Sequence, residues 1–301
     1  MNSSASSAGL VLSSAAAWPA MAPRAEIEGL TLAYGGQPVL QGLQWRLDPG
    51  QVVGLLGRNG AGKTTLLEAL LGLREASAGS VQLFGQPAAR LDDAARARIG
   101  YVPQQSDLFE ELRADELLAY FRSFYPRWND TKVQGLLERW AVPRDIPIGR
   151  MSGGQQQRLS LIRALAHEPE LLVLDEPVAS LDPLARRDFL RELVEQVLDR
   201  GTTVVFSTHI LSDLERVAFN VAFLREGRIA LQSPLDELLE ETRLLIGPEA
   251  LLAALPRAGV GVEVLSRRPG RWLVRRVDEA ALAPGLVAQR ASLEDLFEAL
   301  T

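Results

Sequence analysis

The 301-residue sequence contains no cysteine and only two histidines, His167 and His209. Without cysteine, the chain cannot have a disulfide framework, a thiolate metal site or a cysteine nucleophile. Two histidines are also too few for a multi-histidine metal centre. The composition therefore fits a reducing compartment and excludes several classes of enzyme.

Positive charge is also in short supply, because 32 Lys and Arg residues stand against 38 Asp and Glu residues, for a net charge of −6. An acidic balance disfavours broad, sequence-blind binding to a polyanion, so we expect no nucleic-acid partner. The hydrophobic content of 47% is ordinary for a globular protein. The length suffices for one large domain or two modest ones.

The amino terminus lacks charge altogether. Residues 1–23 carry no charged side chain, and 13 of residues 1–22 are Ser or Ala. A signal peptide would need a basic segment and a compact apolar core, so we expect a disordered tail over residues 1–23 instead. No later run reaches the roughly 20 apolar residues that a membrane-spanning helix needs. If the protein acts at a membrane, another chain must supply the passage.

The sequence does contain an alternation of strand and helix patterns. Strands are expected at 26–34, 45–47, 51–56, 171–174 and 202–206, and helices at 65–73, 155–165 and 183–200. Such alternation indicates an α/β fold with a mostly parallel sheet covered on both faces. The two early strands, which lie near the turn signals Gly35-Gly36 and Pro49-Gly50, predict an antiparallel flank.

We place this α/β core at residues 24–233. Two segments differ from it in residue composition and in the secondary structure they predict. Residues from about 94 to 150 are rich in helix formers and aromatics and predict a helical insertion. Residues 234–301 predict a small α+β C-terminal domain. In that domain, helices are expected at 235–241, 248–255 and 292–300, and a hairpin joins 262–265 to 272–277. Ser292 and Asp295 would cap the last helix.

A glycine-rich loop between an apolar strand and a helix carries the strongest chemical signal. The eight residues Gly57, Arg58, Asn59, Gly60, Ala61, Gly62, Lys63 and Thr64 fit the phosphate-loop pattern G-x-x-x-x-G-K-[ST] without mismatch. Backbone N–H groups in such a loop turn inward around phosphates, and the helix that starts near Thr65 points its positive end at them. Lys63 would reach the β- and γ-phosphates, and the Thr64 hydroxyl would bind Mg²⁺.

The apolar run 171–174 ends in two carboxylates, Asp175 and Glu176. In a parallel sheet, ligands bind at the carboxyl ends of the strands, so both acids would emerge beside the phosphate loop. Adjacent strand residues point to opposite faces, so the two cannot share one role. Asp175 is expected to hold Mg²⁺, and Glu176 to orient and deprotonate an attacking water. Taken alone, this pattern is equally compatible with a polar strand end.

The segment Met151 to Gln155 lies 24 residues before Asp175 and resembles the LSGGQ signature of the ATP-binding cassette (ABC) ATPases, with Met in the leading position. Its site residues would be Ser152, Gly153, Gly154 and Gln155. Amides at a helix N-terminus form a second anion site. In that family, this site faces the γ-phosphate held by the opposite subunit. The resemblance therefore implies that two cassettes sandwich each ATP.

The same resemblance implies roles for further residues. Their motifs occur along the sequence in the same order as in the family. Tyr34 would stack on adenine, Gln104 would touch Mg²⁺ and the water, and His209 would contact the γ-phosphate. Gln105 follows Gln104, so the sequence does not decide which of the two glutamines takes this position. The loop 180–182 would cross the dimer interface. We expect His167 to be structural.

Two stretches favour a transporter within this family. Residues 291–298 resemble the closing motif of ATPases from bacterial exporters whose membrane subunits are separate chains, and residues 124–128 resemble a branch of that group linked to antibiotic or envelope stress. The resemblance implies an ATP-hydrolysing subunit, peripheral at the cytoplasmic face of the membrane, that works with a separately encoded multi-spanning permease. Residues 100–130 would receive the coupling helix of that permease.

Two alternatives stay open. All the nucleotide motifs are intact, so we expect a homodimer, although pairing with a sister cassette is equally permitted. The chain could also be a soluble, non-transport ABC ATPase that remodels a protein or nucleoprotein complex. A cluster of arginines at 267, 268, 271, 275 and 276 could meet anionic lipid or a partner, or simply cover a solvated hairpin.

Overall fold

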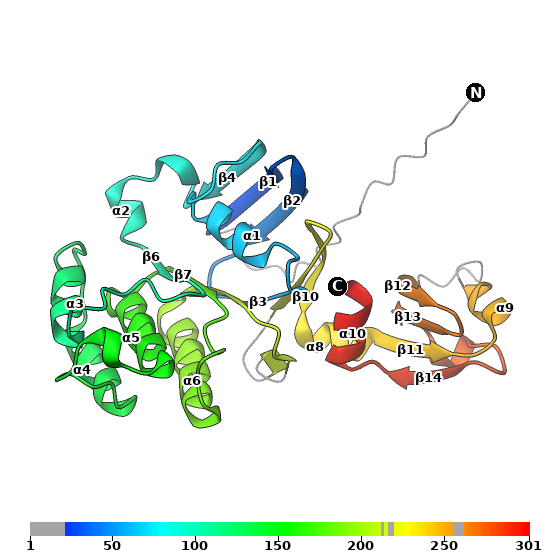
Figure 1. The fold of residues 1–301 in the computed structure, drawn as a ribbon. Helices are drawn as coiled ribbons and strands as arrows, with labels where there is room; N and C mark the ends of the chain where they lie inside the picture. Colours follow the sequence, from blue (N-terminus) through cyan, green and yellow to red (C-terminus); the bar gives the residue numbers. More distant parts are fainter. Residues whose placement is uncertain (1–21, 212–213, 216–219, 256–261) are drawn as a thin grey trace.

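The computed structural model describes residues 22–211, 214–215, 220–255 and 262–301. Figure 1 shows an α/β centre with an antiparallel sheet above it, a group of helices to one side and a small C-terminal unit to the other. The disordered tail expected over residues 1–23 lies almost entirely outside the described residues.

The central sheet has six strands in the order β10-β9-β3-β8-β7-β6. Their bounds are β3 Val52–Leu56, β6 Ile99–Val102, β7 Leu171–Asp175, β8 Thr203–Ser207, β9 Asn220–Arg225 and β10 Arg228–Pro234. All neighbouring pairs are parallel except β9 and β10. The expected mostly parallel sheet is confirmed.

Alternate residues of the central strands belong to two separate cores. In β3, Val53 and Leu55 pack in the core that contains helix α1 (Lys63–Leu70), whereas Val52 and Leu56 pack in the core that contains α5 (Gly153–Ala166) and α6 (Pro183–Arg200). Successive side chains of a strand point to opposite faces. Helices α1 and α5 therefore cover opposite faces of the sheet.

The antiparallel flank is a four-stranded sheet in the order β2-β1-β4-β5. Its strands are β1 Ala25–Tyr34, β2 Gln37–Leu47, β4 Ala78–Leu83 and β5 Gln86–Pro87. The flank was predicted, but β2 begins eight residues before the expected residue 45. The reason is the tight turn at Gly35 and Gly36, whose positive φ angles of 57° and 81° return the chain at once into a long hairpin.

The segment predicted as a helical insertion, residues 94–150, also contains a strand. β6 lies at the edge of the central sheet, beside β7, and the short helices η1 (Ala88–Arg90) and α2 (Asp93–Arg96) precede it. The longer helices begin only later, with α3 (Ala114–Arg122), α4 (Asp130–Arg139) and the turn η2 (Ile148–Arg150). A four-residue strand is too short to reveal a period-two pattern, so the sequence did not separate it from the helices around it.

The C-terminal unit is an antiparallel sheet in the order β12-β13-β11-β14, with helices around it. Its elements are α8 Leu235–Glu241, β11 Thr242–Ile246, α9 Glu249–Leu252, β12 Glu263–Arg268, β13 Arg271–Arg275, η4 Glu279–Ala281, β14 Val287–Arg290 and α10 Leu293–Leu300. Ser292 and Asp295 form the predicted capping box on α10. The apolar side of α10 enters the main core and packs on β9 as well as on β12 and β13, which joins the unit to the central sheet.

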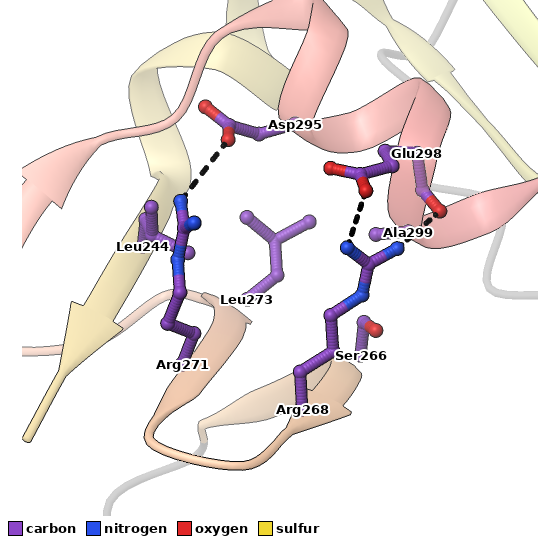
Figure 2. Close-up of a pocket in the computed structure, with 8 residues that line it drawn as sticks. All are labelled: Leu244, Ser266, Arg268, Arg271, Leu273, Asp295, Glu298 and Ala299. Carbon is purple, nitrogen blue, oxygen red and sulfur yellow. Dashed lines mark hydrogen bonds and ion pairs between the residues drawn. The ribbon is translucent and has the colours of Figure 1, made fainter.

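The five arginines of the C-terminal cluster all have intramolecular partners. Figure 2 shows Arg268 and Arg271 on either side of a hollow floored by Leu273, where Arg268 pairs with Glu298 and Arg271 Nη2 lies 3.9 Å from an oxygen of Asp295. The remaining three are Arg275 and Arg276, both paired with Glu241, and Arg267, which lies over the ring of Trp272. Two of these arginines therefore join the hairpin to α10, and two join the end of β13 to α8.

None of the helices in the described part of the chain combines the length and the apolar character needed to cross a bilayer.

Candidate nucleotide site

The phosphate loop lies between β3 and α1, as its sequence predicts. Gly60 and Gly62 have left-handed φ angles of 79° and 97°. A Cβ atom on Gly62 would lie 2.9 Å from Cγ1 of Val39, so only glycine fits at this position. Among the described residues, no side chain caps the N-terminus of α1. The amides of its first turn are therefore available to an external anion.

Lys63 is the first residue of α1 and is almost fully buried. Its ammonium donates to the carbonyl oxygen of Gly57 at 2.9 Å and to that of Arg58 at 3.4 Å, and it lies 3.7 Å from Oε1 of Glu176. The charge is thus held at the mouth of the loop by oxygen atoms. Phosphate oxygens can take the place of these partners.

Thr64 and Asp175 come together, although 111 residues separate them in the sequence. The Thr64 hydroxyl donates to Oδ2 of Asp175 at 2.5 Å. Asp175 ends β7 and has no exposed surface. Hydroxyl and carboxylate oxygens are the ligands that Mg²⁺ prefers, and protein sites for Mg²⁺ generally supply only one or two of them beside substrate phosphates. The two side chains therefore fit the metal that the sequence predicts.

Glu176 and His209 form the third contact of the site. Nδ1 of His209 lies 2.8 Å from Oε2 of Glu176, and 54% of the histidine side chain is exposed. Glu176 is buried and has a positive φ of 50°, a conformation that a non-glycine residue keeps only where its surroundings hold it. A carboxylate, an imidazole and the Lys63 ammonium thus converge beside the phosphate loop, an arrangement suited to proton transfer from a water molecule.

Two predicted residues lie near the site without a contact that fixes their role. Gln104 and Gln105 both follow the carboxyl end of β6, and both are exposed. The geometry therefore does not decide which of the two takes the predicted role. Tyr34 ends β1 and is 45% exposed. The guanidinium of Arg74 lies 5.9 Å from the centroid of that ring and is itself bound by Glu68 of α1.

The signature segment begins helix α5, on the other face of the sheet from α1. Ser152 caps the helix by accepting from the amide of Gln155 at 3.3 Å, and the Gln155 side chain accepts from the amide of Ser152 at 2.8 Å. Ser152 and Gly153 are exposed. Helices α1 and α5 cover opposite faces of the sheet, and within the described residues no hydrogen bond or ion pair joins residues 152–155 to the phosphate loop.

The comparisons with known proteins agree on one family. The family model described as ABC transporter matches residues 40–179. Over nearly its whole length, the sequence is similar to the Nod factor export ATP-binding protein I of Ralstonia nicotianae, with 34% identity over 304 residues that cover 93% of this chain and 94% of the relative. This chain belongs to the ABC transporter family.

As an ABC ATPase, the protein binds and hydrolyses ATP. Solved structures agree with the fold. The ATP-binding subunit of an ABC transporter matches with a TM-score of 0.66 and 30% identity, over 72% of this chain and 92% of that one. A dimeric cassette bound to ADP and Pi, MJ0796, matches with a TM-score of 0.63 and 24% identity, over 70% and 98% of the two chains. The expected P-loop ATPase fold is confirmed.

One residue of this ABC site was missed by sequence reasoning. Ser207, the last residue of β8, is fully buried, and its hydroxyl contacts both Asp175 and the backbone of Glu176. The available signal was a hydroxyl at the end of an apolar strand, two residues before His209. A serine at a strand end is too common for that signal to single it out.

Proposed function

We propose that this chain is the ATP-hydrolysing subunit of a membrane exporter, in which two copies close head-to-tail around two ATP molecules and drive a separately encoded permease. The observation that carries the proposal is the separation of the two anion sites. The phosphate loop opens at α1 and the signature opens at α5, on opposite faces of one sheet. In an ABC ATPase, the signature of a second cassette would then complete each site. The Ralstonia relative is named for export, which supports the direction.

Binding of ATP would begin at the phosphate loop. Lys63 would exchange the carbonyl oxygens of Gly57 and Arg58 for phosphate oxygens, and the uncapped first turn of α1 would face the same phosphates. Tyr34, half exposed at the end of β1, would stack on the adenine ring. Thr64 and Asp175 would hold Mg²⁺, which supplies neutralisation of phosphate charge when bound.

Hydrolysis would depend on Glu176. Its carboxylate can accept the proton of the attacking water, and His209 at 2.8 Å holds that carboxylate in one orientation. His209 is half exposed, so it can also reach the terminal phosphate. The position beside the metal and the water would belong to Gln104 or to its neighbour Gln105, because β6 and β7 are adjacent parallel strands and both glutamines follow the carboxyl end of β6.

Dimer closure would use the signature of the opposite chain. The reciprocal hydrogen bonds between Ser152 and Gln155 hold the first turn of α5 in shape, with Ser152 and Gly153 exposed and directed outward as an anion site. In the closed dimer these groups and Gly154 would contact the γ-phosphate bound by the partner. Hydrolysis would remove that contact and release the closed state.

The permease would dock on an aromatic surface formed by Phe109, Tyr120 and Phe124, residues that are 45%, 47% and 61% exposed. Neighbouring rings in this surface lie 5.0 to 5.6 Å apart between centroids. The ring of Phe121 contacts all three of these rings, and the guanidinium of Arg163 lies over it, 4.8 Å from its centroid.

Arg163 links that surface to the nucleotide site. It belongs to α5, the signature helix, and its guanidinium pairs with Asp107, three residues beyond Gln104, at 3.0 Å. The aromatic surface, the glutamine loop and the signature helix are thus in direct contact. This continuity supports docking of a membrane partner at the cytoplasmic face, with the subunit peripheral to the membrane.

The experiment that tests this function has two parts. Glu176→Gln should lower ATP turnover by about 10²- to 10⁴-fold, the contribution of a positioned base, and should convert the protein from monomer to dimer when Mg·ATP is added, as measured by light scattering. Turnover within tenfold of wild type would remove Glu176 from the role of base.

The transport part is tested by recovering the tagged chain from detergent-solubilised host membranes. Recovery of a multi-spanning membrane protein in equal copy number with the wild-type chain supports the proposal. The double variant Tyr120→Ala/Phe124→Ala should no longer recover this membrane protein. An unchanged melting temperature shows that the double variant is folded. Recovery of only a large cytosolic complex would instead point to a soluble remodelling ATPase.

A further inference from the structure

Ser207 connects the two carboxylates of the site. Its hydroxyl donates to Oδ1 of Asp175 at 2.5 Å, and the backbone N–H of Glu176 donates to the same hydroxyl oxygen at 2.8 Å. The parallel register of β7 and β8 places Ser207 directly opposite Asp175. Both residues are fully buried. The Ser207 hydroxyl thus donates to the side chain of Asp175 and accepts from the backbone of Glu176.

We propose that Ser207 is a positioning residue for ATP hydrolysis, which sets the Asp175 carboxylate for Mg²⁺ and the Glu176 backbone for catalysis. The proposal rests on the roles assigned above to Asp175 and Glu176. Ser207 would touch neither the nucleotide nor the metal.

The effect on Asp175 follows from its two oxygen atoms. Oδ1 is held by Ser207, so Oδ2 is the atom that faces the Thr64 hydroxyl at 2.5 Å. Without Ser207, the carboxylate could turn about its Cβ–Cγ bond and present either oxygen, or neither, to a metal. Outer partners of this kind hold metal ligands in one orientation, and losing one typically costs 10- to 100-fold in metal affinity or activity.

The effect on Glu176 follows from its backbone. Its φ of 50° is unfavourable for a residue with a Cβ atom, and such a conformation persists only where contacts fix it. The hydrogen bond from its N–H to Ser207 is a contact of that kind. The conformation determines where the side chain emerges, and the carboxylate then reaches His209 at 2.8 Å.

The test compares two substitutions on the same strand. Ser207→Ala removes both contacts at the carboxyl end of β8. Thr203→Val removes a matched buried hydroxyl at the other end of β8, where it donates to the carbonyl of Asp48 and accepts from the amide of Gly50. Both variants lose two hydrogen bonds of one buried hydroxyl, but only the first lies at the nucleotide site.

The measurements are binding of a fluorescent ATP analogue, with EDTA and along a Mg²⁺ titration, and steady-state ATP turnover. For Ser207→Ala we expect the affinity in EDTA to equal that of wild type, and the Mg²⁺ concentration for half-maximal enhancement of binding to rise by about 10- to 100-fold, with a similar loss of turnover at fixed Mg²⁺. Thr203→Val should keep the wild-type Mg²⁺ titration and turnover.

A Mg²⁺ titration of Ser207→Ala that coincides with that of Thr203→Val would overturn the proposal. Glu176→Gln in the same assays separates this failure from a failure of the proposed function, because full turnover in that variant would remove the assigned base itself. If Ser207→Ala melts well below Thr203→Val, Ser207→Cys serves in its place, since a thiol keeps the volume but donates only weakly. It should show the same shift in Mg²⁺ dependence.

Discussion

A Cβ atom on Gly154 would lie 2.9 Å from the carbonyl oxygen of Ser180, closer than such atoms come in proteins. Gly154 stands in the first turn of α5, and Ser180 belongs to the loop between β7 and α6. The same helix holds this loop again at its start, where the side chain of Gln157 donates to the carbonyl of Pro177 at 3.1 Å. Helix α5 therefore fixes the loop that follows β7.

Gly154→Ala should lower ATP turnover while leaving ATP binding to the isolated subunit intact. The added methyl group forces the helix start and the Ser180 loop apart, and displacements near 1 Å can cost about 100-fold in rate. The phosphate loop is on the other face of the sheet, so its affinity for a fluorescent ATP analogue should not change. Wild-type turnover in this variant would show that the contact tolerates the methyl group and that the loop position is unimportant.

Gly135→Ala is the matched control and a prediction about stability. Gly135 lies in α4 on an exposed surface, its φ is not left-handed, and a Cβ atom there meets no atom of the described residues within 4 Å. Alanine should raise the free energy of unfolding by roughly 0.5 to 1 kcal/mol, because glycine has more backbone freedom to lose. Urea unfolding measures the gain, and ATP turnover should stay at the wild-type rate.

The sequence contains two lysines, and replacing them should affect the affinity for ATP differently. Lys63→Met should raise the dissociation constant of ATP by about 10- to 100-fold, the worth of a hydrogen bond to a charged group. Lys132→Met should leave that constant unchanged, because Lys132 lies in α4 and pairs with Glu192. Fluorescence titration with an ATP analogue distinguishes them. Equal affinities for Lys63→Met and wild type would contradict the assignment of the phosphate loop.

The parts of the fold that local residues specify could be predicted from the sequence. Helix α6 was predicted with the bounds that the structure gives it. In the structure, Asp182 caps its first turn and Gly201 takes the left-handed conformation after its last. The capped helix α10 and the phosphate loop followed for the same kind of reason. Each is fixed by residues a few positions apart.

The parts that depend on distant partners were missed or shortened. Strands β4, β9 and β14 carry no strong period-two pattern, and each is a strand because a neighbour far along the chain pairs with it. Ser207 illustrates the same limit within the site, since its two partners lie 31 and 32 residues away. Only the register between β7 and β8 makes it part of the site.

His167 should make the protein lose stability as the pH falls from about 6.5 towards 4. Burial lowers the pKa of His167 to about 4 from its ordinary 6.5, while its Nε2 atom lies 3.0 Å from the carbonyl oxygen of Ile99. The unfolded chain therefore binds the proton first, and protonation favours unfolding throughout this window. At 1.36 kcal/mol per pKa unit, the loss is roughly 3 kcal/mol.

His167→Gln checks this assignment, because a glutamine amide can donate to the Ile99 carbonyl but does not titrate. Urea unfolding at several pH values between 7 and 4 should show a flatter profile for the variant than for wild type. Parallel profiles would mean that other groups cause the pH dependence.

The helical part of the protein is joined to the core by a buried charge cluster around Glu192 of α6. Oε1 of Glu192 lies 3.1 Å from Nζ of Lys132 and accepts from the side chain of Gln196 at 3.0 Å, while Oε2 pairs with Arg139. Both cations belong to α4. Glu192 is 5% exposed, so its carboxylate has little contact with solvent.

Glu192→Gln should lower the free energy of unfolding by about 3 to 5 kcal/mol at pH 7, because it leaves the ammonium of Lys132, whose side chain is only 13% exposed, without its counterion. Glu195→Gln is the control, since Glu195 lies three residues further along α6 on its exposed side, where such a change is worth less than about 0.5 kcal/mol. Urea unfolding of the two variants measures the difference. A loss for Glu192→Gln no larger than that for Glu195→Gln would rule out a stabilising role for the cluster.

The sign of the pH dependence supplies a second check. Burial by itself would raise the pKa of Glu192, but the charge of Lys132 and the hydrogen bonds from Arg139 and Lys132 outweigh it and hold the pKa below its ordinary 4.5. The stabilisation is therefore fully present above pH 4.5 and is lost as the pH falls through the lowered value. The difference between wild type and Glu192→Gln should shrink in that acidic range. The double variant Lys132→Met/Glu192→Gln should lose less than the two single variants together, because removing both charges leaves neither one buried alone.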